Sequence, residues 1–248
     1  MNYSQSNREI KLIALDMDGT LLNNQQEVSN SNREAISQAK EKGVQVILCT
    51  GRSIMTCHEY AKSLNLLSNL VTVNGGEIWD QGKLLERNAL QSEQVQWMWE
   101  LSQTYGTKYW ATSIDRVWRN QMPDNILAHQ WLKFGYDIDD TEIRHAILKQ
   151  LKDKPFLETS NSSPVNIEIN AAGINKAQAI TKVCDRLNLS LDNVMAIGDS
   201  LNDILMIQKS GLGVAMGNAQ EEVKHAADWV TITNQEDGVA EAIKQWVL

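Results

Sequence analysis

Short apolar runs alternate with polar, helix-forming stretches toward both ends of this chain of 248 residues. The apolar runs are predicted to be buried strands, at residues 10–15, 43–50, 70–73, 194–199, 212–216 and 229–232. Helices are predicted at 32–42, about 54–64, 176–187, 203–209 and 239–247. Strands that alternate with helices favour a parallel sheet with helices on both faces. We therefore predict an α/β, Rossmann-like core, which would bind ligands beyond the carboxyl ends of its strands.

A different rhythm occupies the middle of the chain, from about Ile78 to Ala172. The pattern here predicts a hairpin at 78–85, extended pieces at 109–113 and 117–120, and a strand at 165–169. Helices are predicted at 92–105, near 123–134 and at 141–151. Most of the eight tryptophans lie in this part, namely Trp79, Trp97, Trp99, Trp110, Trp118 and Trp131. We therefore predict an inserted α+β domain at 78–172, with the core divided between 1–77 and 173–248.

The composition narrows the range of partners and compartments. A net charge of −8, without any Lys/Arg-rich run, argues against a nucleic-acid partner. Cys49, Cys57 and Cys184 lack metal-ligand spacing and are predicted to be free thiols in a reducing compartment. The stretch from Met1 to Glu9 lacks the apolar segment of a secretory signal, and no apolar run could cross a bilayer. We predict a cytoplasmic protein with no membrane partner.

Two carboxylates follow the first predicted strand, in the stretch Asp16-Met17-Asp18-Gly19-Thr20. Alternate strand residues point to the same side, so both acids are predicted to face one small volume. Unpaired, they would repel each other and raise each other's pKa, whereas a divalent cation would remove the repulsion. A site lined by hard oxygen ligands suits Mg2+. The alternative is an ordinary strand end followed by an Asp-Gly turn.

Two further loops carry groups suited to an anion. Thr50 offers a hydroxyl, Gly51 permits close backbone approach, and Ser53 is predicted to cap the next helix, whose free N–H groups favour phosphate. A plain strand, turn and cap would give the same pattern. Lys176 is predicted in the first turn of a helix capped by Asn175, where the helix dipole disfavours a cation. This lysine therefore points to a carboxylate or phosphate partner, unless it is simply exposed.

The last loop with candidate chemistry is Gly198-Asp199-Ser200-Leu201-Asn202-Asp203. Asp199 lies at the tip of a strand and is the better candidate for a metal ligand. Asn202 is predicted on the first helical turn, where its amide could donate to a phosphate oxygen. Ser200 and Asp203 have the spacing of a capping box, so Asp203 is predicted to support the site from behind its ligands.

The order of these motifs, DxDGT, TGR, a helix-leading lysine and GDxxND, resembles the haloacid dehalogenase superfamily. The insert follows Asn74-Gly75-Gly76, a placement similar to the type IIB cap of the Cof-type phosphatases. The resemblance implies that Asp16 is the nucleophile that forms an aspartyl-phosphate. It implies that Asp18 is the general acid and base.

The resemblance also implies the ligands of the metal and the phosphate. Mg2+ would be held by the Asp16 carboxylate, the Asp18 main-chain carbonyl and Asp199. The phosphate would be held by the group Thr50, Gly51, Lys176 and Asn202. Members that cleave carbon–halogen or carbon–phosphorus bonds generally lack the second aspartate, so Asp18 favours phosphate-ester chemistry.

The predicted function is that of a Mg2+-dependent phosphomonoesterase acting on a small phosphorylated metabolite similar to a sugar phosphate. One alternative is a phosphomutase or phosphotransferase, which uses the same intermediate but passes the phosphoryl group to a hydroxyl. Another is a non-catalytic sensor of a phosphorylated metabolite. The sequence leaves the physiological substrate and the oligomeric state open.

Overall fold

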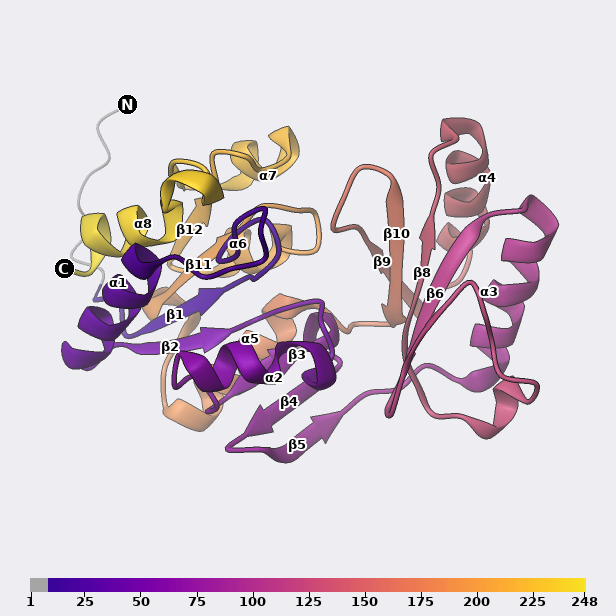
Figure 1. The fold of residues 1–248 in the computed structure, drawn as a ribbon, viewed down its shortest axis with the longest axis horizontal. Helices are drawn as coiled ribbons and strands as arrows, with labels where there is room; N and C mark the ends of the chain where they lie inside the picture. Colours follow the sequence, from indigo (N-terminus) through magenta and orange to yellow (C-terminus); the bar gives the residue numbers. More distant parts are fainter. Residues whose placement is uncertain (1–8) are drawn as a thin grey trace.

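A computed structural model describes residues 9–248 of the chain and shows a larger and a smaller lobe (Figure 1). The larger lobe contains a five-stranded sheet of order β13-β12-β11-β1-β2, in which every neighbouring pair is parallel. Its strands are β1 (Leu12–Leu15), β2 (Gln45–Leu48), β11 (Val194–Gly198), β12 (Leu212–Ala215) and β13 (Trp229–Val230). The predicted Rossmann-like core is confirmed.

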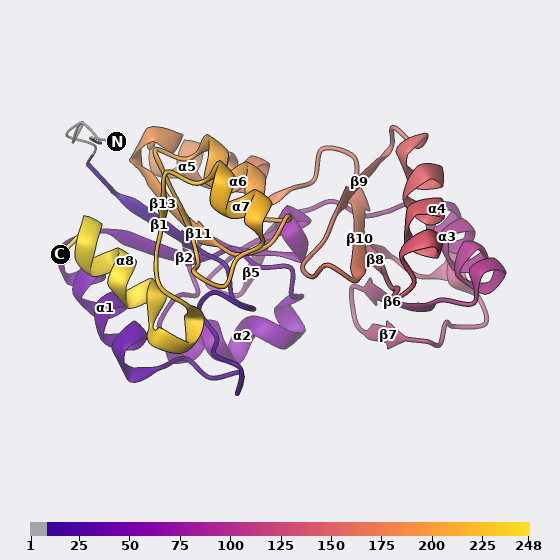
Figure 2. The same ribbon diagram turned by 90° about the horizontal axis from the view of Figure 1, so that it is seen from above.

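Alternate side chains of β1 point to opposite faces of this sheet. Leu12 and Ala14 pack with residues of α5 (Lys176–Leu187), whereas Ile13 and Leu15 pack with residues of α1 (Asn30–Glu41) and α8 (Gly238–Trp246). All four side chains are fully buried, because helices cover the sheet on both faces (Figure 2). The helices of this lobe are α1 (Asn30–Glu41), α2 (Ile54–Ser63), α5, α6 (Ile204–Lys209), α7 (Glu221–Ala226) and α8 (Gly238–Trp246), with 3-10 turns η3 (Leu191–Asn193) and η4 (Asn234–Glu236).

A separate antiparallel sheet lies beside β2 and consists of β3 (Leu70–Thr72), β4 (Glu77–Asp80) and β5 (Lys83–Arg87). The strand near 70–73 is not one of the five strands of the parallel sheet, and it meets the end of β2 through an isolated bridge between Cys49 and Val71. The 3-10 turn η1 (Val73–Gly75) reverses the chain here, which sends β4 back along β3. The predicted hairpin therefore pairs with the larger lobe (Figure 1). The boundary at residue 78 stays a prediction, and this pairing favours a later start of the insert.

The smaller lobe is an antiparallel sheet of order β7-β6-β8-β10-β9 with two helices on its outer face (Figures 1 and 2). Its strands are β6 (Lys108–Ser113), β7 (Val117–Arg119), β8 (Trp131–Asp137), β9 (Leu157–Ser160) and β10 (Asn166–Ala171). The helices α3 (Ser92–Tyr105) and α4 (Thr141–Lys152) confirm two predicted helices. The opposite face of the sheet is turned toward the larger lobe.

The helix predicted near 123–134 is wrong. The chain forms only the short 3-10 turn η2 (Ile126–Ala128) and then enters β8, a central strand of the smaller sheet. In β8, Phe134 and Tyr136 pack in the core beneath α3 and α4, while Lys133 and Asp137 line a cavity on the other face. This alternation is typical of a strand, but charged residues on the inner face hide it in the sequence.

Among residues 9–248, no helix is both long enough and apolar enough for a bilayer span. Of the polar stretch from Met1 to Glu9, only Glu9 belongs to the described residues.

Candidate active site

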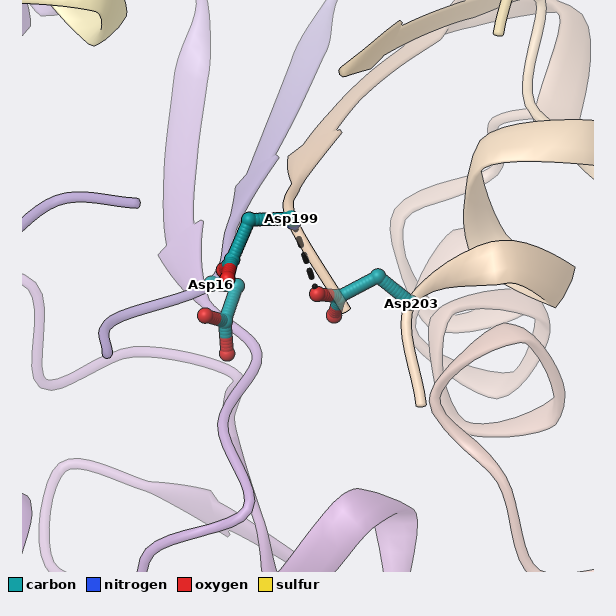
Figure 3. Close-up of side chains that lie close together, drawn as sticks. All are labelled: Asp16, Asp199 and Asp203. Carbon is teal, nitrogen blue, oxygen red and sulfur yellow. Dashed lines mark hydrogen bonds between the residues drawn. The ribbon is translucent and has the colours of Figure 1, made fainter. Parts of the chain in front are cut away.

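Three carboxylates meet beyond the carboxyl ends of the neighbouring strands β1 and β11 (Figure 3). Asp16 follows β1, and Asp199 and Asp203 follow β11. Each offers an oxygen, and these oxygens all lie within 4.8 Å of one another. The meeting of Asp16 and Asp199 follows from the parallel pairing of their strands. Asp203, expected behind the ligands, contributes an oxygen to the same group.

Lys176 supplies a positive charge to this cluster. Its Nζ lies 2.5 Å from Oδ1 of Asp16 and 2.6 Å from Oδ1 of Asp203, and its side chain is fully buried. The predicted cap at Asn175 holds the start of α5, because its side chain accepts a hydrogen bond from the backbone N–H of Gln178. The structure thus rejects the exposed-lysine alternative and identifies carboxylates as the partners of Lys176.

Asp203 also holds the loop after β11. Its Oδ2 accepts hydrogen bonds from the backbone N–H groups of Asp199 and Ser200, at 3.0 and 3.1 Å (Figure 3). The Ser200 hydroxyl contacts the Asp199 carboxylate, so the predicted capping box is only half formed. The helix α6 starts at Ile204, which places Asn202 in the turn before it.

The cluster carries more negative than positive charge. Burial raises the pKa of Asp16 well above its ordinary value, and the positive charge of Lys176 only partly opposes this. Burial, followed by the charge of Asp203, raises the pKa of Asp199 to about 6. Because one lysine faces three carboxylates, a divalent cation would relieve the repulsion, and the oxygen ligands are of the kind Mg2+ prefers.

Gly19 lets the loop after β1 approach Asp199. Its φ is +80°, and a Cβ atom at this position would lie 2.5 Å from a carboxylate oxygen of Asp199. The next residue, Thr20, donates a hydrogen bond of 2.8 Å from its hydroxyl to Asp199. A glycine is therefore required here both by the backbone conformation and by the lack of space.

Asp18 lies apart from the three clustered carboxylates. Arg52 donates two hydrogen bonds to its carboxylate, from Nε at 2.8 Å and from Nη2 at 2.6 Å. The prediction that Asp16 and Asp18 share one small volume therefore holds only in that both line the same cavity. β1 ends at Leu15, so strand alternation no longer sets the directions of these side chains. Arg52 was not predicted as a site residue, although it completes the TGR motif.

A cavity of about 500 Å3 separates these loops from the inner face of the smaller sheet. Gly51 and Asn202 line it, and the buried Thr50 accepts a hydrogen bond of 3.1 Å from the N–H of Arg52. Ser53 precedes α2 as predicted, yet its hydroxyl does not cap the helix. Among residues 9–248, neither Ser53 Oγ nor Asn202 Oδ1 finds a hydrogen-bond partner. Two buried, unpaired polar atoms at one cavity indicate a polar ligand.

The smaller lobe contributes residues to this cavity that were largely not predicted. Trp110 lines the cavity, whereas Trp118 packs within the lobe. Lys133 and Glu168 also reach the cavity, and no role was predicted for them. The sequence signal for Lys133 and Glu168 was the alternation of polar and apolar residues along their strands. That alternation identifies the face that lines the cavity only once the order of the strands in the sheet is known.

Comparison with known proteins identifies a family pattern and similar phosphatases. The sequence pattern of the haloacid dehalogenase-like hydrolases matches residues 13–145 and 123–243. The chain is 54% identical to the 5-amino-6-(5-phospho-D-ribitylamino)uracil phosphatase YcsE of Bacillus subtilis, over 100% of both chains. It is 29% identical to phosphatase YwpJ of the same organism, over 95% of this chain and 99% of that protein.

Solved structures share the whole architecture. A haloacid dehalogenase-like hydrolase from B. subtilis aligns with a TM-score of 0.88 and 26% identity, covering 96% of this chain and 100% of that one. The subclass IIB sugar phosphatase BT4131 aligns with a TM-score of 0.84 and 25% identity, covering 95% and 98%. Because the family pattern spans most of the chain and a relative matches its full length, the chain belongs to the haloacid dehalogenase-like hydrolases, in the Cof-type branch with a type IIB cap, and is a phosphatase.

Proposed function

We propose that this phosphatase hydrolyses 5-amino-6-(5-phospho-D-ribitylamino)uracil, with Mg2+ as its cofactor. The observation that carries the proposal is the 54% identity, over both full lengths, to a phosphatase named for this substrate. This substrate is more specific than the predicted class of sugar-phosphate-like metabolites, because its ribityl chain carries a planar uracil ring at the end opposite the phosphate. We also propose a cytoplasmic location, which the buried, unpaired cysteines support.

The cavity between the lobes supports this substrate. Its core side offers the carboxylates and loops for a phosphate, while its cap side offers Trp110, Arg119 and Asp137. Trp110 lies over the β8 backbone at Gly135, where a Cβ atom would come within 2.3 Å of the indole. An aromatic side chain flanked by one cation and one anion suits a planar heterocycle that both donates and accepts hydrogen bonds.

In the proposed mechanism, Asp16 attacks the phosphorus and takes the phosphoryl group as an aspartyl-phosphate. Asp18, which lines the cavity wall, gives its proton to the departing ribityl oxygen. Asp18 then accepts a proton from the water that attacks the phosphorus, and Asp16 is released with inorganic phosphate. Lys176 holds the Asp16 carboxylate throughout. Mg2+, held by Asp16, the Asp18 main-chain carbonyl and Asp199, would neutralise charge on the phosphoryl group.

Thr50, the Gly51 amide and Asn202 are proposed to complete the phosphate site. The hydroxyl of Thr50 accepts from the Arg52 N–H and keeps its own proton for a phosphate oxygen. Asn202 lies at the cavity, and its Nδ2 donates one N–H to Oδ1 of Asn74, which leaves the second N–H of this amide for a phosphate oxygen. The phosphoryl acceptor is proposed to be water rather than a second hydroxyl, in line with the phosphatases that this chain resembles.

Phosphate release from three esters tests the substrate. We expect kcat/KM for the ribitylaminouracil phosphate to exceed that for ribitol 5-phosphate by about a hundredfold, because a well-packed ring contributes roughly 3 kcal/mol. p-Nitrophenyl phosphate reports the chemistry alone. Equal kcat/KM for the first two esters would contradict the proposed substrate while leaving the phosphatase activity in place.

The role of Trp110 has a matched control in Trp118. Trp110→Ala is expected to lower kcat/KM for the ribitylaminouracil phosphate about tenfold, because the ring would lose one aromatic contact and part of its burial. It should leave kcat/KM for ribitol 5-phosphate within about twofold. Trp118→Ala removes an indole that bonds to Ser113 inside the cap, so it should change the melting temperature and not this ratio. A similar loss on both esters in Trp110→Ala would refute ring recognition.

A further inference from the structure

A buried ion pair lies on the inner face of the cap, away from the three clustered carboxylates. Lys133 of β8 and Glu168 of β10 approach to 3.0 Å, and their side chains are only 4% and 5% exposed. A buried pair of this kind is a poor source of stability, because desolvation of both charges offsets most of their attraction. Its position at the boundary between the lobes therefore needs another explanation.

Lys133 reaches across to the loop that follows β2. Its Nζ donates a hydrogen bond of 2.9 Å to the main-chain carbonyl of Gly51. The following N–H, that of Arg52, donates to the Thr50 hydroxyl. The peptide between Gly51 and Arg52 is thus held at both ends, once by the cap and once by the core. Its orientation sets where the Thr50 hydroxyl and the neighbouring amides point.

Glu168 is anchored to the core through Asn74. Oε2 of Glu168 accepts a hydrogen bond of 2.7 Å from Nδ2 of Asn74, and the Oδ1 of Asn74 lies 3.3 Å from Nδ2 of Asn202. Asn74 and the preceding Val73 have φ of 58° and 54°. A β-branched residue in this left-handed region is strained, so the surrounding contacts must hold the turn in place. One connected network thus joins the cap pair to Gly51 and to Asn202.

The same contacts argue against Lys133 as a direct phosphate ligand. Its charge is neutralised by Glu168, and two of its three N–H donors are already committed. A lysine meant for the substrate phosphate would gain nothing from a buried carboxylate beside it, since that carboxylate would repel the phosphate. The contact that Lys133 makes with the larger lobe is its hydrogen bond to the Gly51 carbonyl.

We propose that Lys133 and Glu168 are positioning residues, through which the seated cap orients the loop of Thr50 and Gly51 for phosphoryl transfer. The proposal rests on the proposed phosphate site and adds a task for the cap beyond recognition of the leaving group. Its consequence is specific: a change in this pair lowers kcat for p-nitrophenyl phosphate and for ribitol 5-phosphate alike. A change at Trp110 affects only esters that carry a ring at the far end of a ribityl chain.

The test compares Lys133→Met, Glu168→Gln and the double variant on p-nitrophenyl phosphate and on ribitol 5-phosphate. We expect kcat to fall about tenfold to a hundredfold on both esters, as a small misplacement of a catalytic loop would cause, with little change in KM. The double variant removes both charges together, so its melting temperature should stay within a few degrees of the parent. A loss of kcat in a stable double variant separates positioning from folding.

Glu168→Gln distinguishes positioning from direct phosphate binding. If Lys133 acts through Gly51, removal of its partner lowers kcat and does not tighten inhibition by inorganic phosphate. Tighter inhibition would mean that the freed lysine binds phosphate and would overturn the proposal. Unchanged kcat on p-nitrophenyl phosphate in Lys133→Met or in the double variant would overturn it as well.

Thr50→Val identifies which proposal has failed. This variant removes the hydroxyl but keeps the shape of the side chain. If Thr50→Val loses activity and the Lys133 and Glu168 variants do not, the phosphate site stands and the positioning role falls. If Thr50→Val keeps full activity, the proposed phosphate site is itself incorrect at Thr50, and the positioning role falls with it.

Discussion

Replacement of Asp16 by asparagine is expected to reduce turnover of p-nitrophenyl phosphate by at least about a thousandfold, because a carboxamide cannot act as the nucleophile. The fold should persist, since Asn is of equal size and its amide oxygen can still accept a hydrogen bond from Lys176. Lys176 also keeps its second partner, Asp203. We expect a melting temperature close to that of the parent. The measurement is kcat at saturating Mg2+, together with thermal unfolding.

The covalent intermediate provides an independent check of the same assignment. Beryllium fluoride should form an adduct on Asp16 and on no other side chain. Asp18→Asn is the informative control, because p-nitrophenolate leaves without needing a proton and the acid is not required for the first step. This variant should therefore still become phosphorylated, with slow hydrolysis of the intermediate. Substantial turnover by Asp16→Asn in a clean preparation, or an adduct elsewhere, would eliminate the covalent mechanism.

Asp199 and Asp203 are expected to respond differently to replacement by asparagine. Within residues 9–248, the Asp199 carboxylate accepts hydrogen bonds from the hydroxyl groups of Thr20 and Ser200 and pairs with no lysine, so it is free to hold a cation. Asp199→Asn should therefore raise the Mg2+ concentration for half-maximal activity by about a hundredfold, roughly 3 kcal/mol of binding free energy. The free energy of unfolding should change little. The measurement is a Mg2+ titration of phosphate release.

Asp203 is bound into the structure far more tightly. It pairs with the buried Lys176 and accepts the backbone N–H groups of Asp199 and Ser200. Asp203→Asn should lower the free energy of unfolding by about 3 kcal/mol, because both carboxylate oxygens accept hydrogen bonds and the new NH2 group would face a buried donor. Its Mg2+ requirement should rise less than that of Asp199→Asn. A crystal structure with Mg2+ on Asp203 and not on Asp199 would reverse these roles.

Much of the candidate active site could be predicted from local pattern alone. The apolar runs before Asp16 and Asp199 are short and bounded by polar loops, so they indicate buried parallel strands. Parallel neighbours end at one edge of the sheet, and this brings the two aspartates together. The prediction of an anionic partner for Lys176 required only its position after the Asn175 cap, where an unpaired cation is unfavourable. These inferences need no knowledge of distant contacts.

The tertiary structure decided what depends on partners far apart in the sequence. The strand β8 was missed in the sequence because it contains the charged residues Lys133 and Asp137. The partner of Lys133, Glu168, lies on another strand and could not be recognised from the sequence. Asp18 lies beyond the end of β1, where strand alternation no longer sets the direction of a side chain, and its carboxylate contacts Arg52. The contact between Lys133 and Gly51 joins the cap to the core over a separation of 82 residues. Sequence periodicity shows which face of an element is apolar, whereas only the packed lobes show what each polar side chain meets.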